Sequence, residues 1–139
     1  MAPNYLTGLS AFLKANTAVA ALVSTRIWFP EIPEDQEEAM PQKAILLQPA
    51  GGAYAADYIL LGEPKVDVRC YAQKLDDCML IYLAVHDALK AMQRTASYGK
   101  LIMHNCTQDG GPLFLREPEL NWPFMLSTWT LKASEITQT

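Results

Sequence analysis

The sequence predicts an α+β fold with a mixed, mostly antiparallel sheet of about four strands and helices packed on one face. Two neighbouring segments carry this prediction. Residues 63–73 alternate polar and apolar side chains, which is typical of a strand with one buried and one solvated face. Residues 76–94 then place apolar side chains at helical spacing. Because 139 residues suit one domain, residues 1–139 are predicted to share a single core.

The first predicted elements are two short helices. Apolar residues recur at helical spacing over residues 5–13, and a second run starts at Thr17, a suitable N-cap residue. We expect a kink near Asn16, between the two helices. Residues 27–29 have strand composition, and Pro30 ends this short β segment.

Residues 30–41 differ abruptly in composition. The segment PEIPEDQEEAMP has three prolines and five carboxylates, which disfavour both a strand ladder and a buried helix. We predict an exposed acidic loop. The segment lacks the glycine and the ligand spacing of a calcium-binding loop. Its carboxylates are therefore candidates for contact with a partner or for simple solvation. These carboxylates are Glu34, Asp35, Glu37 and Glu38.

A hairpin with a long tip is predicted next. Residues 43–48 have strand composition, and residues 49–62 form the tip before the following strand. Loops longer than about a dozen residues usually have a function in compact domains. Tyr54 and Tyr58 in this tip are candidate contact residues, because tyrosine is favoured at protein interfaces.

The helix predicted over residues 76–94 has Asp76 as a cap for its first N–H groups, and Lys90 and Arg94 suit its C-terminal end. Its core face is predicted to hold Cys78, Ile81, Tyr82, Val85, Leu89 and Met92. Further apolar residues off this face are Met79, Leu80, Leu83, Ala84 and Ala88. Such a helix is expected to lie between the sheet and a second partner, either another subunit or the two N-terminal helices.

The last part of the chain is predicted to hold two more strands joined by a loop. Phe114 and Trp122 in that loop are candidate contact residues, like Met79 and Leu83 on the helix. The predicted segments are a turn at residues 97–99, a strand at 100–107, a loop at 111–123, a strand at 125–133 and a loose tail at 134–139.

Charge and cysteine usage exclude several classes of protein. Eleven basic against fifteen acidic residues give a net charge of -4, so we expect no sequence-specific nucleic-acid binding. The start lacks the pattern of a secretory signal, and no apolar run is long enough to span a bilayer, so no membrane partner is expected. Three cysteines without C-x-x-C spacing indicate synthesis in a reducing compartment.

The residues give no catalytic or ligand-binding signature. A zinc set built from His104 and the three cysteines, Cys70, Cys78 and Cys106, lacks the short paired spacing of structural zinc sites. A nucleophilic cysteine would need a nearby histidine that a third group orients, and His86 lies about two helical turns from Cys78. The glycine pairs at 51–52 and 110–111 stand outside any phosphate-binding motif. We predict no metal, no cofactor and no enzymatic activity.

Four segments in order carry a resemblance to a known family: AVAALVSTRIW at 18–28, PQKAILLQ at 41–48, VDVRCYA at 66–72 and MLSTWTLKA at 125–133. Val68, Cys70, Tyr71 and Ala72 form the most distinctive cluster. Over residues 5–133 the chain resembles the tail-completion or tail-terminator proteins of long-tailed bacteriophages. The acidic residues 31–38 depart from that pattern, because the family has a shorter connection there.

This resemblance implies a structural virion protein, made in the host cytoplasm, that forms a ring of identical copies at the head-proximal end of a tail tube. The ring is expected to be hexameric, to end tube growth and to join the tail to the head. Its partners would be the tail tube protein and the head–tail connector protein, and genome DNA would pass through it. Two alternatives stay open: a neck adaptor or stopper ring of the same joint, and a small ligand-binding or enzymatic α+β domain.

Overall fold

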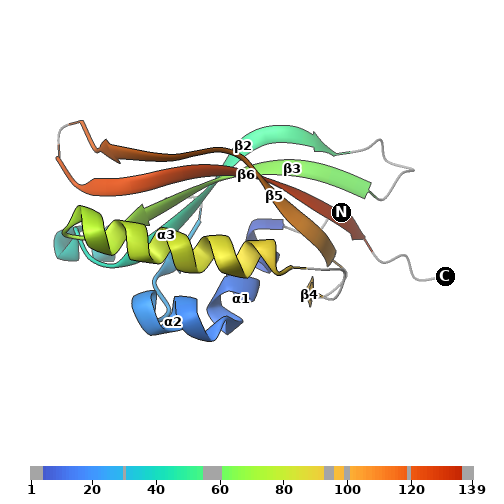
Figure 1. Ribbon diagram of the computed structural model, residues 1–139, viewed down its shortest axis with the longest axis horizontal. Helices are drawn as coiled ribbons and strands as arrows, with labels where there is room; N and C mark the ends of the chain where they lie inside the picture. The colour runs from blue at the N-terminus through green and yellow to red at the C-terminus, as the bar shows by residue number, and fades with distance from the viewer. Residues whose placement is uncertain are drawn as a thin grey trace.

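The computed structural model describes residues 5–29, 31–54, 61–92, 96–98, 101–118 and 120–135. A six-stranded sheet has the strand order β1-β2-β3-β6-β5-β4, and the α-helices lie against one of its faces (Figure 1). The strands are β1 (Ile27–Trp28), β2 (Ala44–Tyr54), β3 (Leu61–Tyr71), β4 (Ala96–Tyr98), β5 (Leu101–Arg116) and β6 (Pro123–Glu135). The helices are α1 (Tyr5–Ala15), α2 (Thr17–Val23), the 3₁₀ helix η1 (Glu34–Ala39) and α3 (Leu75–Lys90).

The predicted α+β class is confirmed. The sheet is mixed, because β1 pairs in parallel with β2, whereas the pairs β2–β3, β3–β6, β5–β6 and β4–β5 are antiparallel. It has six strands instead of about four. Strand β1 lies in the short β segment predicted at residues 27–29, whereas β4 takes the place of the turn predicted at 97–99. A strand as short as β4 carries almost no periodic signal in the sequence.

Strand β3 has the two faces that its alternation predicts. Val66, Val68 and Cys70 are fully buried in the main core between the sheet and the helices. Asp67 and Arg69 point to the opposite, outer face of the sheet, where Asp67 accepts a hydrogen bond of 2.7 Å from the Thr128 hydroxyl on β6. The inner side of β3 is therefore apolar, and its outer side is polar at Asp67 and Arg69.

The predicted core face of α3 is confirmed, because all six of its residues are buried in the main core. Ala88 was placed off this face, but it is 2% exposed and belongs to the core. The prediction of Asp76 as the cap was wrong: Lys74 is the N-cap residue, and Asp76 lies in the first turn. The helix ends at Lys90 rather than near Arg94, although Met92 beyond it is still buried.

The bend between the N-terminal helices lies where it was predicted. The axes of α1 and α2 differ by 92°. Asn16, and not Thr17, is the N-cap residue of α2, because its side-chain oxygen accepts a 3.1 Å hydrogen bond from the Val19 amide. Within the described residues no single helix is long and apolar enough to cross a bilayer; α1 and α2 reach that length and composition only as this bent pair.

Both long hairpins extend further than their composition suggests. Strand β5 continues through Gly110–Gly111 to Arg116, so most of the predicted loop at 111–123 is strand that pairs with the start of β6. Strand β2 likewise runs to Tyr54 and β3 starts at Leu61, which leaves residues 55–60 of the predicted tip outside the described residues. Strand β6 includes Ser134 and Glu135 of the predicted tail, whose last four residues also lie outside that range. Backbone pairing with a neighbouring strand overrides the glycine and proline content of these segments.

A second, smaller core lies on the outer face of the sheet. Its buried residues are Met40, Leu46, Tyr71 and Phe124, and the half-buried Trp28, Ile32, Trp122 and Leu126 pack against them. Ile32 and Met40 flank the acidic segment and hold it against this face of the sheet. The acidic residues are exposed as predicted, but they lie on a 3₁₀ helix instead of an irregular loop.

The adjacent glycines of β5 form a matched pair for a stability measurement. Gly111 has φ +84°, and a Cβ there would lie 2.5 Å from the Leu126 carbonyl oxygen, whereas a Cβ at Gly110 would meet only Thr128 at 3.9 Å. Gly111→Ala is expected to lower the free energy of unfolding by about 1–3 kcal/mol, and Gly110→Ala by less than about 1 kcal/mol. Denaturant unfolding measures both, and equal losses would contradict this close approach of the two strands.

Candidate interaction surface

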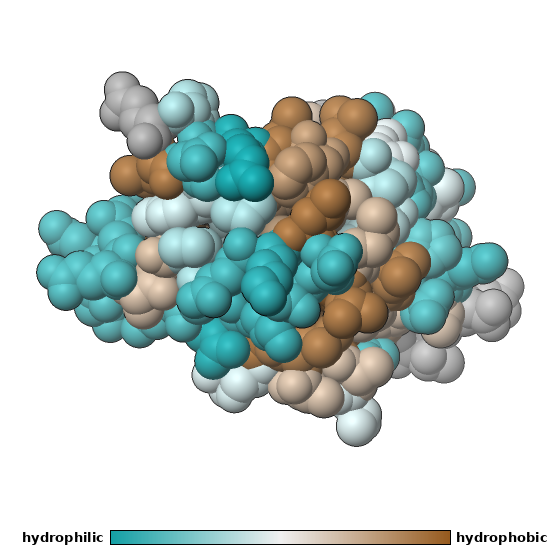
Figure 2. All heavy atoms as spheres, turned by 60° about the vertical axis from the view of Figure 1, so that its left-hand side comes forward, coloured by the Kyte–Doolittle hydropathy of each residue, from teal (hydrophilic) through white to brown (hydrophobic). Residues whose placement is uncertain are grey.

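The large apolar side chains that reach solvent are concentrated on two elements. Among the described residues, eight are exposed, and all lie on α3 or on the β5–β6 hairpin. On α3 these are Leu75, Met79, Leu80 and Leu83, and on the hairpin Leu113, Phe114, Leu115 and Leu120. Figure 2 shows the end of the molecule where α3 begins and this hairpin turns: apolar residues reach the surface there in patches between hydrophilic ones. We call these eight side chains the apolar surface.

The α3 part of this surface lies opposite the core. Leu75, Met79 and Leu83 follow one another at intervals of four residues, so they share one side of the helix. Helix α2 packs against α3, yet Leu80 and Leu83 remain 52% and 47% exposed. The N-terminal helices therefore cover only part of this side, and apolar area remains open on the monomer.

The hairpin part is apolar on both faces of the sheet. Phe114 pairs with Met125 of the main core, whereas Leu113 and Leu115 pair with Leu126 and Phe124 of the outer core. Residues that face each other across an antiparallel pair lie on the same side of a sheet. Phe114 thus faces the side of the helices, and the two leucines extend the outer core toward solvent.

A polar network fixes the turn of this hairpin. One oxygen of Glu117 accepts hydrogen bonds from the Tyr71 hydroxyl at 2.6 Å and from Arg69 at 3.1 Å. The Arg69 guanidinium also lies 4.9 Å from the centre of the Phe124 ring. Trp122 packs edge-on against Tyr71, with ring centres 6.4 Å apart. These contacts tie the turn to β3, so the hairpin presents its leucines from a fixed position.

The surroundings of Tyr71 also raise the pKa of its hydroxyl group. Burial and the hydrogen bond to Glu117 raise the pKa of Tyr71 from 10.0 to about 12, although the Arg69 charge acts in the opposite direction. The Nε atom of Arg69 is buried and has no hydrogen-bond partner among the described residues. The network therefore stabilises Tyr71 in its neutral form.

The acidic residues lie near the same end of the molecule. Glu34, Asp35, Glu37 and Glu38 are exposed on η1, which Figure 1 shows in cyan beside the start of α3. The flanking Ile32 and Met40 contact the cluster that contains Trp122 and Phe124. The structure thus brings four of the predicted contact residues close to the hairpin.

The other predicted contact residues have varied positions. Met79, Leu83 and Phe114 belong to the apolar surface, while Trp122 is half-buried in the outer core. The backbone of Tyr54 is part of β2, and Tyr58 lies outside the described residues. The sequence prediction missed Leu75, Leu113, Leu115 and Leu120 as contact candidates. Three of them could have been found from the apolar run Leu113–Leu115 and from Leu120. This part of the chain was predicted to be a loop because it contains several prolines.

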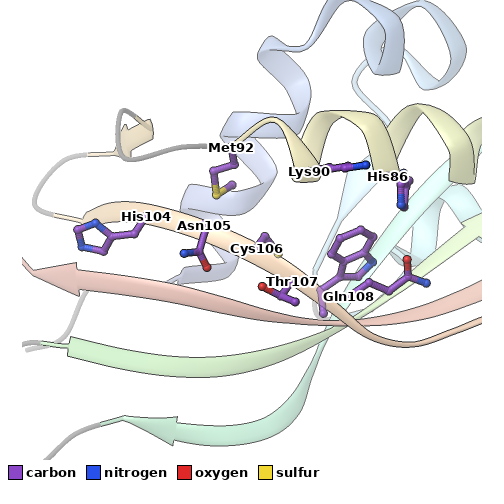
Figure 3. A pocket seen from close by; sticks show the side chains of 9 residues that line it. His86, Lys90, Met92, His104, Asn105, Cys106, Thr107 and Gln108 are labelled. Carbon is purple, nitrogen blue, oxygen red and sulfur yellow. The ribbon is translucent and has the colours of Figure 1, made fainter.

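A cavity of about 650 Å³ opens between α3 and β5. Figure 3 shows His86, Lys90 and Met92 on its helix side and the residues from His104 to Gln108 along β5. Trp129 completes the lining, with its ring centre 5.8 Å from that of His86. His104 Nε2 lies 2.7 Å from the Ser134 hydroxyl.

None of the three cysteines is an activated nucleophile. Burial raises the pKa of the Cys106 thiol to about 12 and that of Cys78 to about 11, and it also raises the pKa of Cys70. A thiol is a weak nucleophile when its pKa is far above neutrality. In the part of the chain that the structure describes, no three His, Cys, Asp or Glu side chains are arranged to hold a metal ion.

Comparison with known proteins gives a likeness in fold. No protein-family model and no curated protein match the chain. A chain of the solved structure "Virion of native gene transfer agent (GTA) particle" is similar, with a TM-score of 0.64 over 93% of each chain and 18% sequence identity. At this identity the likeness shows a shared fold.

The Tyr71 pKa predicts how stability responds to alkaline pH. The pKa of Tyr71 is about 12 in the folded chain and 10.0 for an unperturbed tyrosine, which stands for the unfolded chain. The neutral phenol therefore contributes its full stabilisation below pH 10, and this contribution is lost as pH rises toward 12. Denaturant unfolding should show a fall in stability over this range that is smaller in Tyr71→Phe. Tyr82→Phe is the control, and an unchanged fall in Tyr71→Phe would contradict the assignment.

Proposed function

We propose that this chain is a structural protein of a phage-like virion, which forms a ring of identical copies at the head-proximal end of a tail tube and joins the tail to the head. The apolar surface carries the proposal. Eight large apolar side chains among the described residues reach solvent on a helix and a neighbouring hairpin, and this apolar area is open for association.

The likeness in fold supports the class of protein. The matching chain belongs to a structure described as a virion of a gene transfer agent, and the alignment covers nearly the whole of both chains. The four sequence segments that resemble tail-completion or tail-terminator proteins agree with it. The location in a virion is inferred from that structural neighbour. The ring is inferred from the sequence resemblance to tail-completion or tail-terminator proteins.

The geometry of the apolar surface suits a closed ring. Rings need a heterologous contact, in which two different surfaces of neighbouring copies meet. We infer that the exposed face of α3 around Leu80 and Leu83 contacts the hairpin around Leu113 and Leu120 of the next copy. Both patches present leucines from ordered elements, so little conformational entropy is lost on contact.

The acidic segment has a separate role in this proposal. A channel through which DNA passes must not bind the phosphate backbone, and carboxylates repel it. We infer that the carboxylates of η1 or the polar outer face of the sheet line the channel or face a neighbouring ring. Replacing Glu34, Asp35, Glu37 and Glu38 by alanine is expected to reduce head–tail joining; an unchanged yield of infectious particles would reject this role.

Locating the protein in particles tests the proposal. A tagged chain, visualised by antibody labelling in negative-stain images, is expected at the junction of tail and head. A position within the neck, on the head side of the tube, would identify a neck adaptor or stopper ring instead. Mature particles that lack the chain, or turnover of a substrate by the purified protein, would overturn the structural role.

Leu83→Glu is expected to separate folding from assembly. Because Leu83 is about half exposed, the free energy of unfolding should change by less than about 0.5 kcal/mol, while ring formation and head–tail joining are lost. Sedimentation velocity and complementation of a null phage measure the two effects. Ala21→Glu, at an exposed position of α2, is the matched control. Normal assembly of Leu83→Glu would show that α3 does not form the contact.

A further inference from the structure

We propose that the outer edge of β5 at residues 104–108, together with the adjoining cavity, binds an extended segment of a partner protein that inserts a carboxylate side chain beside Lys90. This site is distinct from the apolar surface, and it does not rest on the virion assignment. Two features support it: a strand edge that no described strand covers, and a cavity next to that edge with an exposed lysine in its lining.

The free edge follows from the sheet topology. Strand β5 pairs with β6 along one side, and on its other side β4 pairs only with Leu101, Ile102 and Met103. Among the described residues no strand lies along the outer side of β5 beyond Met103. Unpaired N–H and C=O groups on such an edge are a template for an added strand.

The edge borders the cavity directly. His104, Asn105, Cys106, Thr107 and Gln108 all line it, although side chains of a strand alternate between its two faces. Five consecutive residues line one cavity when backbone atoms of the strand, and not side chains alone, form part of its wall. The register of β5 with β6 is irregular between Met103 and Asn105 and again between Gln108 and Gly110, so the regular part of β5 at this edge lies between these two points. This regular part is as long as a typical short strand.

The lining determines what side chain would enter. The base of the cavity is apolar and aromatic, with Met92, Cys106 and Trp129 all buried. The polar groups of Trp129 and Gln108 are already used, because Trp129 donates to Ser127, and Gln108 accepts from Tyr82 and donates to Gly110. These groups shape the cavity without offering a free partner.

Among the remaining polar residues of the lining, Asn105 and Thr107 are uncharged and Lys90 carries a positive charge. Lys90 is exposed and forms no ion pair within the described residues, and His86 and His104 lie on the same lining. No carboxylate is among the described residues that line the cavity; Asp87 lies beside it, 3.5 Å from His86, and Asp109 lies 3.7 Å from Lys65. A carboxylate from outside would therefore find an unpaired ammonium group.

Two short peptides test this proposal. The probes are the acetylated and amidated peptides Thr-Val-Glu-Val-Thr and Thr-Val-Gln-Val-Thr, and the readout is amide hydrogen exchange of the full chain. At saturating glutamate peptide, exchange of the outward amides within residues 104–108 is expected to slow by about tenfold or more, because added strands hydrogen-bond to them. The glutamine peptide should bind about fivefold more weakly.

Lys90→Ala is the decisive variant. This variant should bind the two peptides with equal affinity, because Lys90 supplies the charge that distinguishes them. Amide exchange of residues 104–108 should still slow on binding, because β5 supplies the backbone contacts. Lys74→Ala is the matched control, because Lys74 is exposed at the other end of α3, about 24 Å away along the helix axis. It should retain the preference for glutamate.

Four outcomes would overturn the proposal. Two concern amide exchange: neither peptide slows exchange at residues 104–108, or exchange slows only on another strand. The other two are equal affinity of the two peptides for the unmodified chain, and slower exchange at residues 104–108 that appears when the protein concentration alone is raised. The last result would assign the edge to a second copy of the chain. None of these results bears on the ring, which sedimentation velocity and particle imaging test separately.

Discussion

The antiparallel pairing of β3 with β6 is the constraint on which the other features of this molecule depend. Its register places Val66 opposite Trp129 and Cys70 opposite Met125 on the helix side, and Asp67 opposite Thr128 on the outer side. A shift by one residue would turn every one of these side chains to the wrong face. The buried Trp129 donates its indole N–H to Ser127 at 2.9 Å, so the main core encloses a satisfied polar pair.

The same pair of strands organises both surfaces available for binding. Tyr71 and Arg69, on β3, hold Glu117 and thereby the turn of the β5–β6 hairpin. Trp129, on β6, contacts His86 of α3 and forms the base of the cavity next to the edge of β5. The hairpin and the cavity are thus positioned by side chains on opposite faces of the central strands. This arrangement places two separate surfaces on ordered backbone within a small domain.

The features of the folded chain agree with a role in assembly. Its three cysteines are buried and have raised pKa values, and its exposed apolar side chains lie on two elements near one end. Burial on association releases free energy in proportion to the apolar area removed from water. In the proposed ring each copy supplies this area to its neighbour, and the polar outer face of the sheet and the carboxylates of η1 remain in solvent. An extended partner bound at β5 would add a second, backbone-mediated contact.

The sequence by itself determined the α+β class, the two faces of β3, the core face of α3 and the exposure of the acidic residues. Each of these depends on local periodicity or composition over a continuous segment, where the pattern of side chains directly reflects which face is buried. The same periodicity placed Met79 and Leu83 outside the core face of α3, whereas Phe114 was chosen as an aromatic residue of a predicted loop that is a strand.

Only the tertiary structure decided the lengths of the hairpins, the short strand β4 at the sheet edge and the grouping of the exposed leucines. Residues 110–116 have the glycine and proline content of a loop, but they lie in a strand because β6 pairs with Gly110 and again with the residues from Leu113 to Arg116. Likewise, Ile32 and Met40 fix the acidic segment by contacts with strands distant in sequence. Such contacts form between segments that are far apart in the chain, so their free energy leaves no pattern in either segment alone.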